Sequence, residues 1–190
     1  MPLGWAIAVI ALWVLMVAVA LAALALMRQV GVLTVLIHQG HEDGPRIGTE
    51  APAFAGRAIG SGRLVSKSDL KGRRAVVAFM AAECEGCRDL IGPLNELAAA
   101  NGRGAAVLVV AGGDASMARK LMDEQGLGVP TVPDSEAEAF GLYGVRNTPL
   151  LVLLDERGVV VGKGPANDRD QLRQLLAETY GPVSSEPAAE

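Results

Sequence analysis

The sequence predicts an α/β fold in which a mixed central sheet is flanked by helices, preceded by one N-terminal transmembrane helix. Three observations support this prediction. An uncharged apolar stretch lies near the start of the 190-residue chain. Further along, short apolar runs alternate with amphipathic segments, as strands and helices do in α/β proteins. The only two cysteines, Cys84 and Cys87, closely follow one of those apolar runs.

The apolar stretch, Gly4–Met27, contains 24 residues without a charge or a proline. As a helix it would be about 36 Å long, whereas the hydrocarbon core of a bilayer is about 30 Å thick. A cleaved signal peptide is the alternative, because small residues such as those of Ala18–Ala20 offer a cleavage site. Such peptides begin with basic residues, however, and no Lys or Arg precedes Arg28. We therefore expect an uncleaved membrane anchor at residues 1–28.

Residues 29–50 are expected to form a juxtamembrane linker, because Gly, Pro and charged residues are frequent from Gly40 onward. Its histidines, His38 and His41, are interpreted as polar linker residues, since no further cluster of metal ligands lies nearby. The remainder of the chain is expected to divide into a folded domain at 51–180 and a polar, disordered tail at 181–190. The net charge of −4 gives no basic surface for nucleic acid, so no nucleic-acid partner is expected.

The domain begins with two buried strands, each followed by a helix, and continues with a short helix, a β-hairpin and a last helix. This order implies a parallel half-sheet joined to an antiparallel half, with helices on both faces. The helices are identified by their caps and by apolar residues spaced three or four apart. The predicted strands lie at 75–80 and 105–110, and a hairpin of two further strands turns at 156–158. The first predicted helix has Leu90, Leu94 and Leu97 inward, the second runs from Asp114 to about Gly126 with Met117 and Leu121 inward, and a short one begins at about Ser135. The last helix is capped by Asp168 and Gln171 and has Leu172, Leu175, Leu176 and Thr179 inward.

The two cysteines admit four interpretations: a structural disulfide, a zinc site, a haem attachment point or a redox pair. A disulfide that closes so small a ring constrains the unfolded chain very little. A structural zinc ion needs four ligands, and no histidine follows His41. Covalent haem attachment needs a histidine directly after the second cysteine, where this chain has Arg88.

A redox pair fits the sequence context best. The cysteines follow a buried strand and open a helix, which exposes the first sulfur at the helix N-terminus, where unpaired N–H groups and the helix dipole favour a thiolate. Cys84 is therefore the expected attacking sulfur. Cys87, one turn along, is expected to resolve the mixed disulfide. No metal and no cofactor is expected.

Two stretches of the chain, "AVVAFMAAECEGC" and "VRNTPLLVLLDERGVVVGKG", resemble the thioredoxin superfamily, and the resemblance covers about Gly48–Tyr180. It implies a thioredoxin-like fold and a protein thiol–disulfide oxidoreductase. It also implies a cis peptide bond between Thr148 and Pro149 beside the cysteines, with the backbone of Thr148 pairing with a bound substrate strand. A proline that simply starts a strand is the alternative for Pro149.

More narrowly, "RIGTEAPAF" and "LMRQVGVL" are similar to membrane-anchored, extracytoplasmic members of the superfamily, above all the thioredoxin-like proteins of methylamine dehydrogenase maturation. The reductases of cytochrome c maturation, some of which carry Cys-Glu-Pro-Cys, are the second candidate family. The resemblance implies a soluble domain on the periplasmic side of the inner membrane, a disulfide-containing protein substrate, and an electron donor in the membrane or outside the cytoplasm. Arg28 weakly favours the opposite orientation by the positive-inside rule.

The candidate site departs from the superfamily pattern in two ways. Glu83 stands where Trp usually precedes the first cysteine, and the strand before the site has no buried acid to accept a proton. Glu85 or Glu83 must then assist any proton transfer. Both carboxylates should oppose formation of the Cys84 thiolate, with Arg88 offsetting part of this effect. Strong oxidants owe their potential to a stabilised reduced form, which the two carboxylates would weaken, so we expect a reductant or an isomerase. The alternative is that both glutamates are ordinary solvated surface charges.

Three other functions are open at this stage. A peroxidase of the related peroxiredoxin group would have Thr or Ser three residues before the reactive cysteine, where this chain has Ala81. A copper-binding factor on the same fold would add a distal histidine, and none follows His41. A purely structural assembly factor would not use the cysteines at all.

Overall fold

The computed structural model describes residues 4, 5, 7, 9–21, 43–100 and 105–181. The chain divides into two units, Met1–Glu42 and Asp43–Glu190. In the first unit residues 9–21 are helical, and their large apolar side chains from Ile10 to Leu21 are exposed. None of the helices within the described residues has the length and apolar character needed to cross a bilayer. The predicted anchor, linker and C-terminal tail all extend into residues outside the described ranges.

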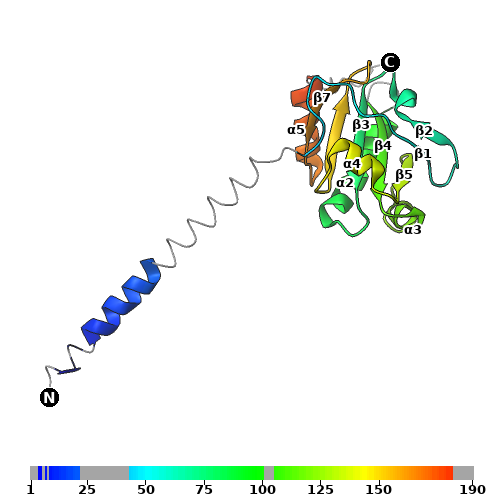
Figure 1. The fold of residues 1–190 in the computed structure, drawn as a ribbon. Helices are drawn as coiled ribbons and strands as arrows, with labels where there is room; N and C mark the ends of the chain where they lie inside the picture. The colour runs from blue at the N-terminus through cyan, green and yellow to red at the C-terminus, as the bar shows by residue number, and fades with distance from the viewer. Residues whose placement is uncertain (1–3, 6, 8, 22–42, 101–104, 182–190) are drawn as a thin grey trace, which may run out of the picture. The chain divides into compact units, whose positions relative to one another are not determined.

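The second unit is built on a five-stranded sheet with the order β5-β4-β3-β6-β7 (Figure 1). The central strand β3 is parallel to β4 and antiparallel to β6. Beyond them, β5 is parallel to β4 and β7 is antiparallel to β6. The sheet is therefore half parallel and half antiparallel, as predicted. The strands are β3 (Ala75–Met80), β4 (Ala106–Gly112), β5 (Thr131–Asp134), β6 (Leu150–Leu154) and β7 (Val160–Gly164).

The central strand β3 is buried along its whole length, which explains its purely apolar sequence. Because successive side chains of a strand point to opposite faces, β3 contributes to two separate cores. Val76 and Met80 belong to one core, whereas Val77 and Phe79 belong to the other. A strand covered on both faces has no polar side, so its sequence shows no alternation.

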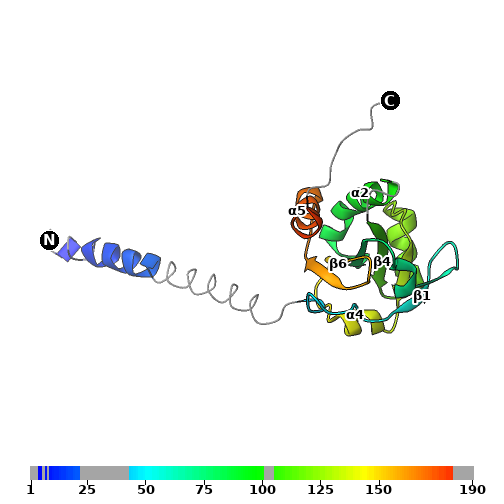
Figure 2. The same cartoon turned by 90° about the horizontal axis from the view of Figure 1, so that it is seen from above.

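Helices cover both faces of the sheet, as predicted. The core on one face is shared by α2 (Glu85–Ala99), α3 (Ala115–Arg119) with its π-helical continuation η2 (Lys120–Glu124), and α5 (Arg169–Tyr180). The core on the other face is shared by α4 (Glu138–Tyr143), the β1–β2 hairpin (Ala55–Arg57 and Leu64–Ser66) and the short helix η1 (Lys67–Leu70). Figure 2 shows α2 and α5 on one side of the sheet and α4 and β1 on the other.

The predicted helix caps are present. The Asp114 carboxylate accepts hydrogen bonds from the backbone N–H groups of Ser116 and Met117, at 2.8 and 3.1 Å. The Asp168 carboxylate accepts from the N–H of Gln171 at 2.9 Å. The second half of that capping box is shifted, because the Gln171 side chain accepts from the N–H of Asn167 and not from that of Asp168.

Two parts of the prediction differ from the structure. The short helix expected from about Ser135 begins at Glu138, because the Asp134 carboxylate caps it by accepting from the N–H groups of Ala139 and Phe140 at 3.2 and 2.9 Å. The strands β1, β2 and β5 were not expected. They are only three or four residues long, too short for a clear alternation of apolar and polar residues.

Tyr180, the last residue of α5, holds together the end of the β3–β6 pair that lies opposite the cysteines. Its hydroxyl lies 2.9 Å from the carbonyl oxygen of Ala75 and 2.8 Å from that of Leu154, two residues paired across the strands. Burial raises the pKa of Tyr180 well above its ordinary value, so the hydroxyl keeps its proton as a donor at neutral pH.

We expect Tyr180→Phe to lower the free energy of unfolding by about 1 kcal/mol, because two carbonyl groups lose a common hydrogen-bond donor. Urea unfolding of the full chain in detergent, followed by circular dichroism, measures the change. An unchanged unfolding midpoint would show that the hydroxyl contributes nothing to the pairing of these strands.

Candidate active site

The two cysteines lie where β3 leads into α2. Phe79 pairs with Leu150 at the end of the antiparallel β3–β6 ladder. The chain that leaves β3 and the chain that enters β6 therefore meet at the same edge of the sheet. The first of these segments contains Cys84 and the second contains Thr148, so residues that are 64 positions apart in the sequence become neighbours.

Cys84 is the N-cap residue of α2, with an extended backbone at φ −83° and ψ 117°. Its sulfur accepts a hydrogen bond from the backbone N–H of Cys87 at 3.2 Å, in the manner of an N-cap side chain. The first sulfur therefore stands at the positive end of the helix, where the N–H groups of the first turn have no partner within the helix. This is the position that the sequence predicted.

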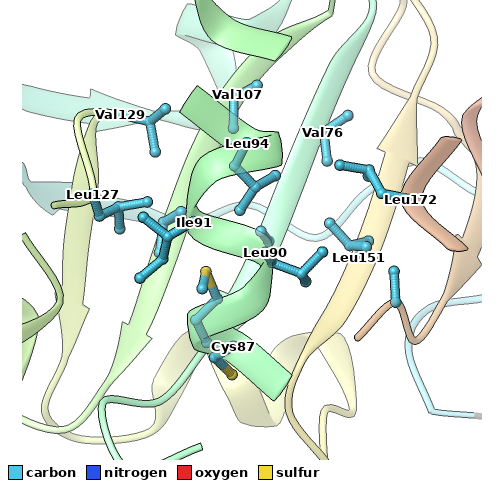
Figure 3. Packing of buried hydrophobic residues seen from close by; sticks show 14 of the residues in the cluster. Val76, Cys87, Leu90, Ile91, Leu94, Val107, Leu127, Val129, Leu151 and Leu172 are labelled. Atoms are coloured by element: carbon cyan, nitrogen blue, oxygen red, sulfur yellow. The ribbon is translucent and has the colours of Figure 1, made fainter. Parts of the chain in front are cut away.

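Cys84 and Cys87 form a disulfide, with their Cα atoms 5.2 Å apart. The exposure of the two cysteines differs: Cys87 is 0% exposed, whereas Cys84 is half-buried. Figure 3 shows Cys87 on α2 near Leu90 and Ile91, which pack into the core. A partner molecule can therefore approach Cys84 but not Cys87.

Thr148 and Pro149 complete the arrangement that the sequence predicted. The peptide bond between them is cis, as the resemblance implied. The sulfur of Cys84 lies 3.4 Å from the carbonyl oxygen of Thr148. Pro149 is buried and Thr148 is half-buried, so the backbone of Thr148 lines the accessible side of the cysteine pair.

The charged residues around the disulfide are exposed. Within the described part of the chain, Glu83, Glu85 and Arg88 make no ion pair and no hydrogen bond through their side chains. Arg88 therefore does not neutralise either glutamate by direct contact. The tuning of the cysteines by these three residues stays a prediction.

Two polar residues near the site were not found by the sequence analysis. Gln125, which follows η2, donates from Nε2 to the carbonyl oxygen of Ala82 at 3.2 Å, and its Oε1 is buried without a hydrogen-bond partner among the described residues. Asn167 lies against Gly86, the glycine between the cysteines. Neither residue belongs to a sequence motif, and only the tertiary fold brings them to the site.

A metal-binding role for the linker histidines is not addressed by the structure, because His38 and His41 lie outside the described ranges. Among the residues inside those ranges, no three His, Cys, Asp or Glu side chains come together in a group that could hold a metal ion.

Comparison with known proteins places this site in a family. The profile of the AhpC/TSA family matches residues 47–163. The methylamine utilization protein MauD of Paracoccus denitrificans is 31% identical over 180 residues, which cover 88% of this chain and 84% of that protein. MauD of Methylobacillus flagellatus is 30% identical over 181 residues, covering 88% and 83%.

Among solved structures, the chain is similar to a putative thiol:disulfide interchange protein DsbE from Chlorobium tepidum, with a TM-score of 0.63 and 25% identity. The similarity covers 74% of this chain and 99% of that protein. The domain therefore has a thioredoxin-like fold.

The difference in burial predicts that the two cysteines differ in reactivity. After reduction, iodoacetamide should modify Cys84 at least about tenfold faster than Cys87, because the first sulfur is accessible and stands at the helix N-terminus. Peptide mapping by mass spectrometry after timed alkylation of the full chain measures both rates. Equal rates, or faster modification of Cys87, would contradict the assignment of Cys84 as the attacking sulfur.

Proposed function

The chain belongs to the AhpC/TSA family, alongside the MauD proteins, and on that premise we propose that it is a protein thiol–disulfide oxidoreductase. The observation that carries the proposal is the disulfide at the start of α2, with Cys84 accessible beside Thr148 and Cys87 buried. A purely structural disulfide would need no accessible sulfur. An exchange reaction needs one sulfur that can be reached and a second that stays shielded until the mixed disulfide has formed.

The proposed reaction begins with the reduced pair. Cys84 first gives up its proton to form the thiolate, which attacks one sulfur of the substrate disulfide. A new bond joins the two sulfurs, the bond between the two substrate sulfurs breaks, and the other substrate sulfur leaves as a thiolate that takes up a proton. Cys87 then loses its proton and attacks the sulfur of Cys84. The bond between Cys84 and Cys87 forms, and the second substrate thiol is released with a proton. The enzyme has then passed two electrons and two protons to the substrate.

Proton transfer in this scheme falls to the exposed glutamates. The β3 strand beneath the site is entirely apolar, so it offers no acid or base. Glu85 is the first residue of α2 and Glu83 directly precedes Cys84, so both can exchange protons with water beside the sulfurs. We assign Glu85, with Glu83 as the second candidate, the relay of the proton from Cys87 to the leaving thiolate.

The direction of exchange is proposed to be reduction or isomerisation of substrate disulfides. Negative charge next to Cys84 disfavours its thiolate and so weakens the stabilisation of the reduced form on which strong oxidants depend. The oxidised enzyme must then be reduced again by a dithiol electron donor in the membrane or outside the cytoplasm.

The proposed substrate is a disulfide-rich protein undergoing maturation, of the methylamine dehydrogenase type. The relatives named methylamine utilization proteins support this choice, since the similarity spans 88% of the chain. Reduction of apocytochromes during cytochrome c maturation is the second candidate. It is favoured by the Cys84-Glu85-Gly86-Cys87 motif, which differs by one residue from the Cys-Glu-Pro-Cys of some of those reductases. A copper-binding or purely structural assembly factor is the alternative from another class.

A single-pass inner-membrane anchor at residues 1–28 is proposed to tether the domain on the periplasmic side. The uncharged stretch Gly4–Met27 supports it, and so does the exposure of apolar side chains such as Trp13 and Leu15 in the helix at 9–21, since an apolar helix surface needs an apolar surrounding. In this proposal residues 29–50 form the linker, 51–180 the domain and 181–190 the tail.

Reduction of insulin disulfides by the full chain in detergent, with dithiothreitol as donor, tests the activity. We expect catalysis by the wild type and loss of at least about 100-fold in Cys84→Ser, because no nucleophile remains at the accessible position. Asn95→Ala, a change in the C-terminal half of α2, should keep the activity and serves as the control. Insulin reduction by Cys84→Ser at the wild-type rate would contradict the role of Cys84, and full biological complementation by this variant would favour the assembly-factor alternative.

Labelling of intact cells with a membrane-impermeant thiol reagent tests the location. After mild reduction, Cys84 should be modified without lysis, because the proposed domain faces the periplasm. Protection of the free thiols until the cells are lysed would place the domain in the cytoplasm, the side that Arg28 weakly favours.

A further inference from the structure

The last part of the proposed linker, residues 43–50, lies along β7, an edge strand of the sheet. The N–H of Gly48 donates to the carbonyl oxygen of Val160 at 2.8 Å, near the start of β7. Further toward the anchor, Nζ of Lys163 donates to the carbonyl oxygen of Gly44 at 3.2 Å, near the end of β7. The end of β7 pairs with the start of β6, at the edge of the sheet where the cysteines lie. The first residues of this segment therefore belong to the same edge.

The start of the segment holds the loop at residues 144–149, which joins α4 to β6. The backbone N–H of Gly44 donates to the carbonyl oxygen of Gly144 at 3.4 Å. The carboxylate of Asp43 accepts a hydrogen bond from Nδ2 of Asn147, and the two atoms are 2.7 Å apart. The loop is therefore tied to the segment at two points, once through the backbone and once through a side chain.

The hydrogen bond from Asn147 to Asp43 acts on the part of the loop that is not buried. Val145 and Pro149 are buried, whereas Arg146 and Asn147 between them are exposed. An exposed stretch of backbone with few buried contacts opens locally at little cost in free energy. A hydrogen bond that ties this stretch to the segment along β7 opposes such opening, so Asp43 is in a position to fix the loop.

We propose that Asp43 is a positioning residue of the redox site, which holds Asn147 and thereby keeps the backbone of the next residue, Thr148, beside the Cys84 sulfur. The carbonyl oxygen of Thr148 lies 3.4 Å from that sulfur. The inference rests on the proposed oxidoreductase function, in which a substrate disulfide has to reach Cys84 alongside this loop. A loop that moves would present the substrate with a less well-defined site. The end of the linker is then a working part of the site as well as a tether.

Three substitutions separate this hydrogen bond from other effects of the two residues. Asp43→Ala removes the acceptor. Asp43→Asn has nearly the same size, loses the negative charge and keeps one oxygen that can accept the hydrogen bond from Asn147. Asn147→Ala removes the donor. If the hydrogen bond is the cause, Asp43→Ala and Asn147→Ala should have equal effects, and combining them should add nothing further.

Steady-state reduction of insulin by the full chain in detergent is the first measurement. We expect Asp43→Ala to raise the KM for insulin about fivefold, the size of effect that the loss of one hydrogen bond produces, with kcat within about twofold of the wild type. Asn147→Ala and the double variant should raise this KM by the same factor of about five. Asp43→Asn should restore the KM to within about twofold of the wild-type value.

Hydrogen–deuterium exchange of the peptide that covers residues 144–149 is the second measurement, and it does not depend on activity. In Asp43→Ala the amides of the loop should exchange at least about threefold faster than in the wild type, because the loop opens more often. In Asp43→Asn they should exchange at the wild-type rate. Unchanged exchange in Asp43→Ala would show that Asp43 does not hold the loop, and would overturn the inference.

Thr49→Val is the matched control. The hydroxyl of Thr49 donates to the carbonyl oxygen of Arg46 at 2.6 Å, so this variant also loses one side-chain hydrogen bond of the segment. The backbone of Thr49 pairs with Val160 at the start of β7, away from the loop. Thr49→Val should therefore leave the KM for insulin and the exchange of the loop at their wild-type values.

Three results in the insulin assay would overturn the inference while the wild type remains active. They are a wild-type KM in Asp43→Ala, a KM in Asp43→Asn as high as in Asp43→Ala, and additive effects of Asp43→Ala and Asn147→Ala. A wild type that does not reduce insulin would instead refute the proposed function, and with it the role of Asp43 in the site, whatever the exchange rates.

Discussion

The pairing of β3 with β6 is the constraint on which the redox site depends, because it decides which residues stand beside the cysteines. The ladder ends with Phe79 opposite Leu150, and this register brings the carbonyl of Thr148 to 3.4 Å from the Cys84 sulfur. A shift of the register by one residue would turn every side chain of β6 to the other face of the sheet. Each face of the sheet packs against its own hydrophobic core, so such a shift would disrupt the packing of the β6 side chains in both cores and is strongly disfavoured.

The same constraint separates the roles of the two sulfurs. The start of α2 places Cys84 at the N-cap, facing the loop that enters β6, while Cys87 turns inward with the buried face of the helix. This asymmetry follows from the helical repeat, because a residue three positions along begins the face that packs on the sheet. In the proposed exchange reaction, this difference in burial is enough to determine that the substrate meets Cys84 before Cys87.

Much of this arrangement could be predicted from the sequence. The apolar run of β3, the hairpin of β6 and β7 and the caps at Asp114 and Asp168 are local signals, and from them a parallel half-sheet joined to an antiparallel half could be predicted. The contacts of Gln125 with Ala82 and of Asn167 with Gly86 could not be predicted, because they join segments that only the packing of helices on the sheet brings together. Gly86 is visible in the sequence between the cysteines, but the close contact with the Asn167 carboxamide, which leaves no room for a side chain at position 86, is seen only in the structure.

The central proposal is that Cys84 and Cys87 form a working redox couple poised toward reduction by two exposed glutamates, Glu85 between the cysteines and Glu83 at the position where the superfamily usually has tryptophan. The midpoint potential of the full chain, measured by equilibration with dithiothreitol or glutathione buffers and mass analysis of alkylated cysteines, tests it most directly. The account predicts a two-electron couple clearly more negative than about −120 mV, the value of a strong disulfide oxidant. A potential at or above that value, or a disulfide that does not equilibrate with these buffers, would contradict it.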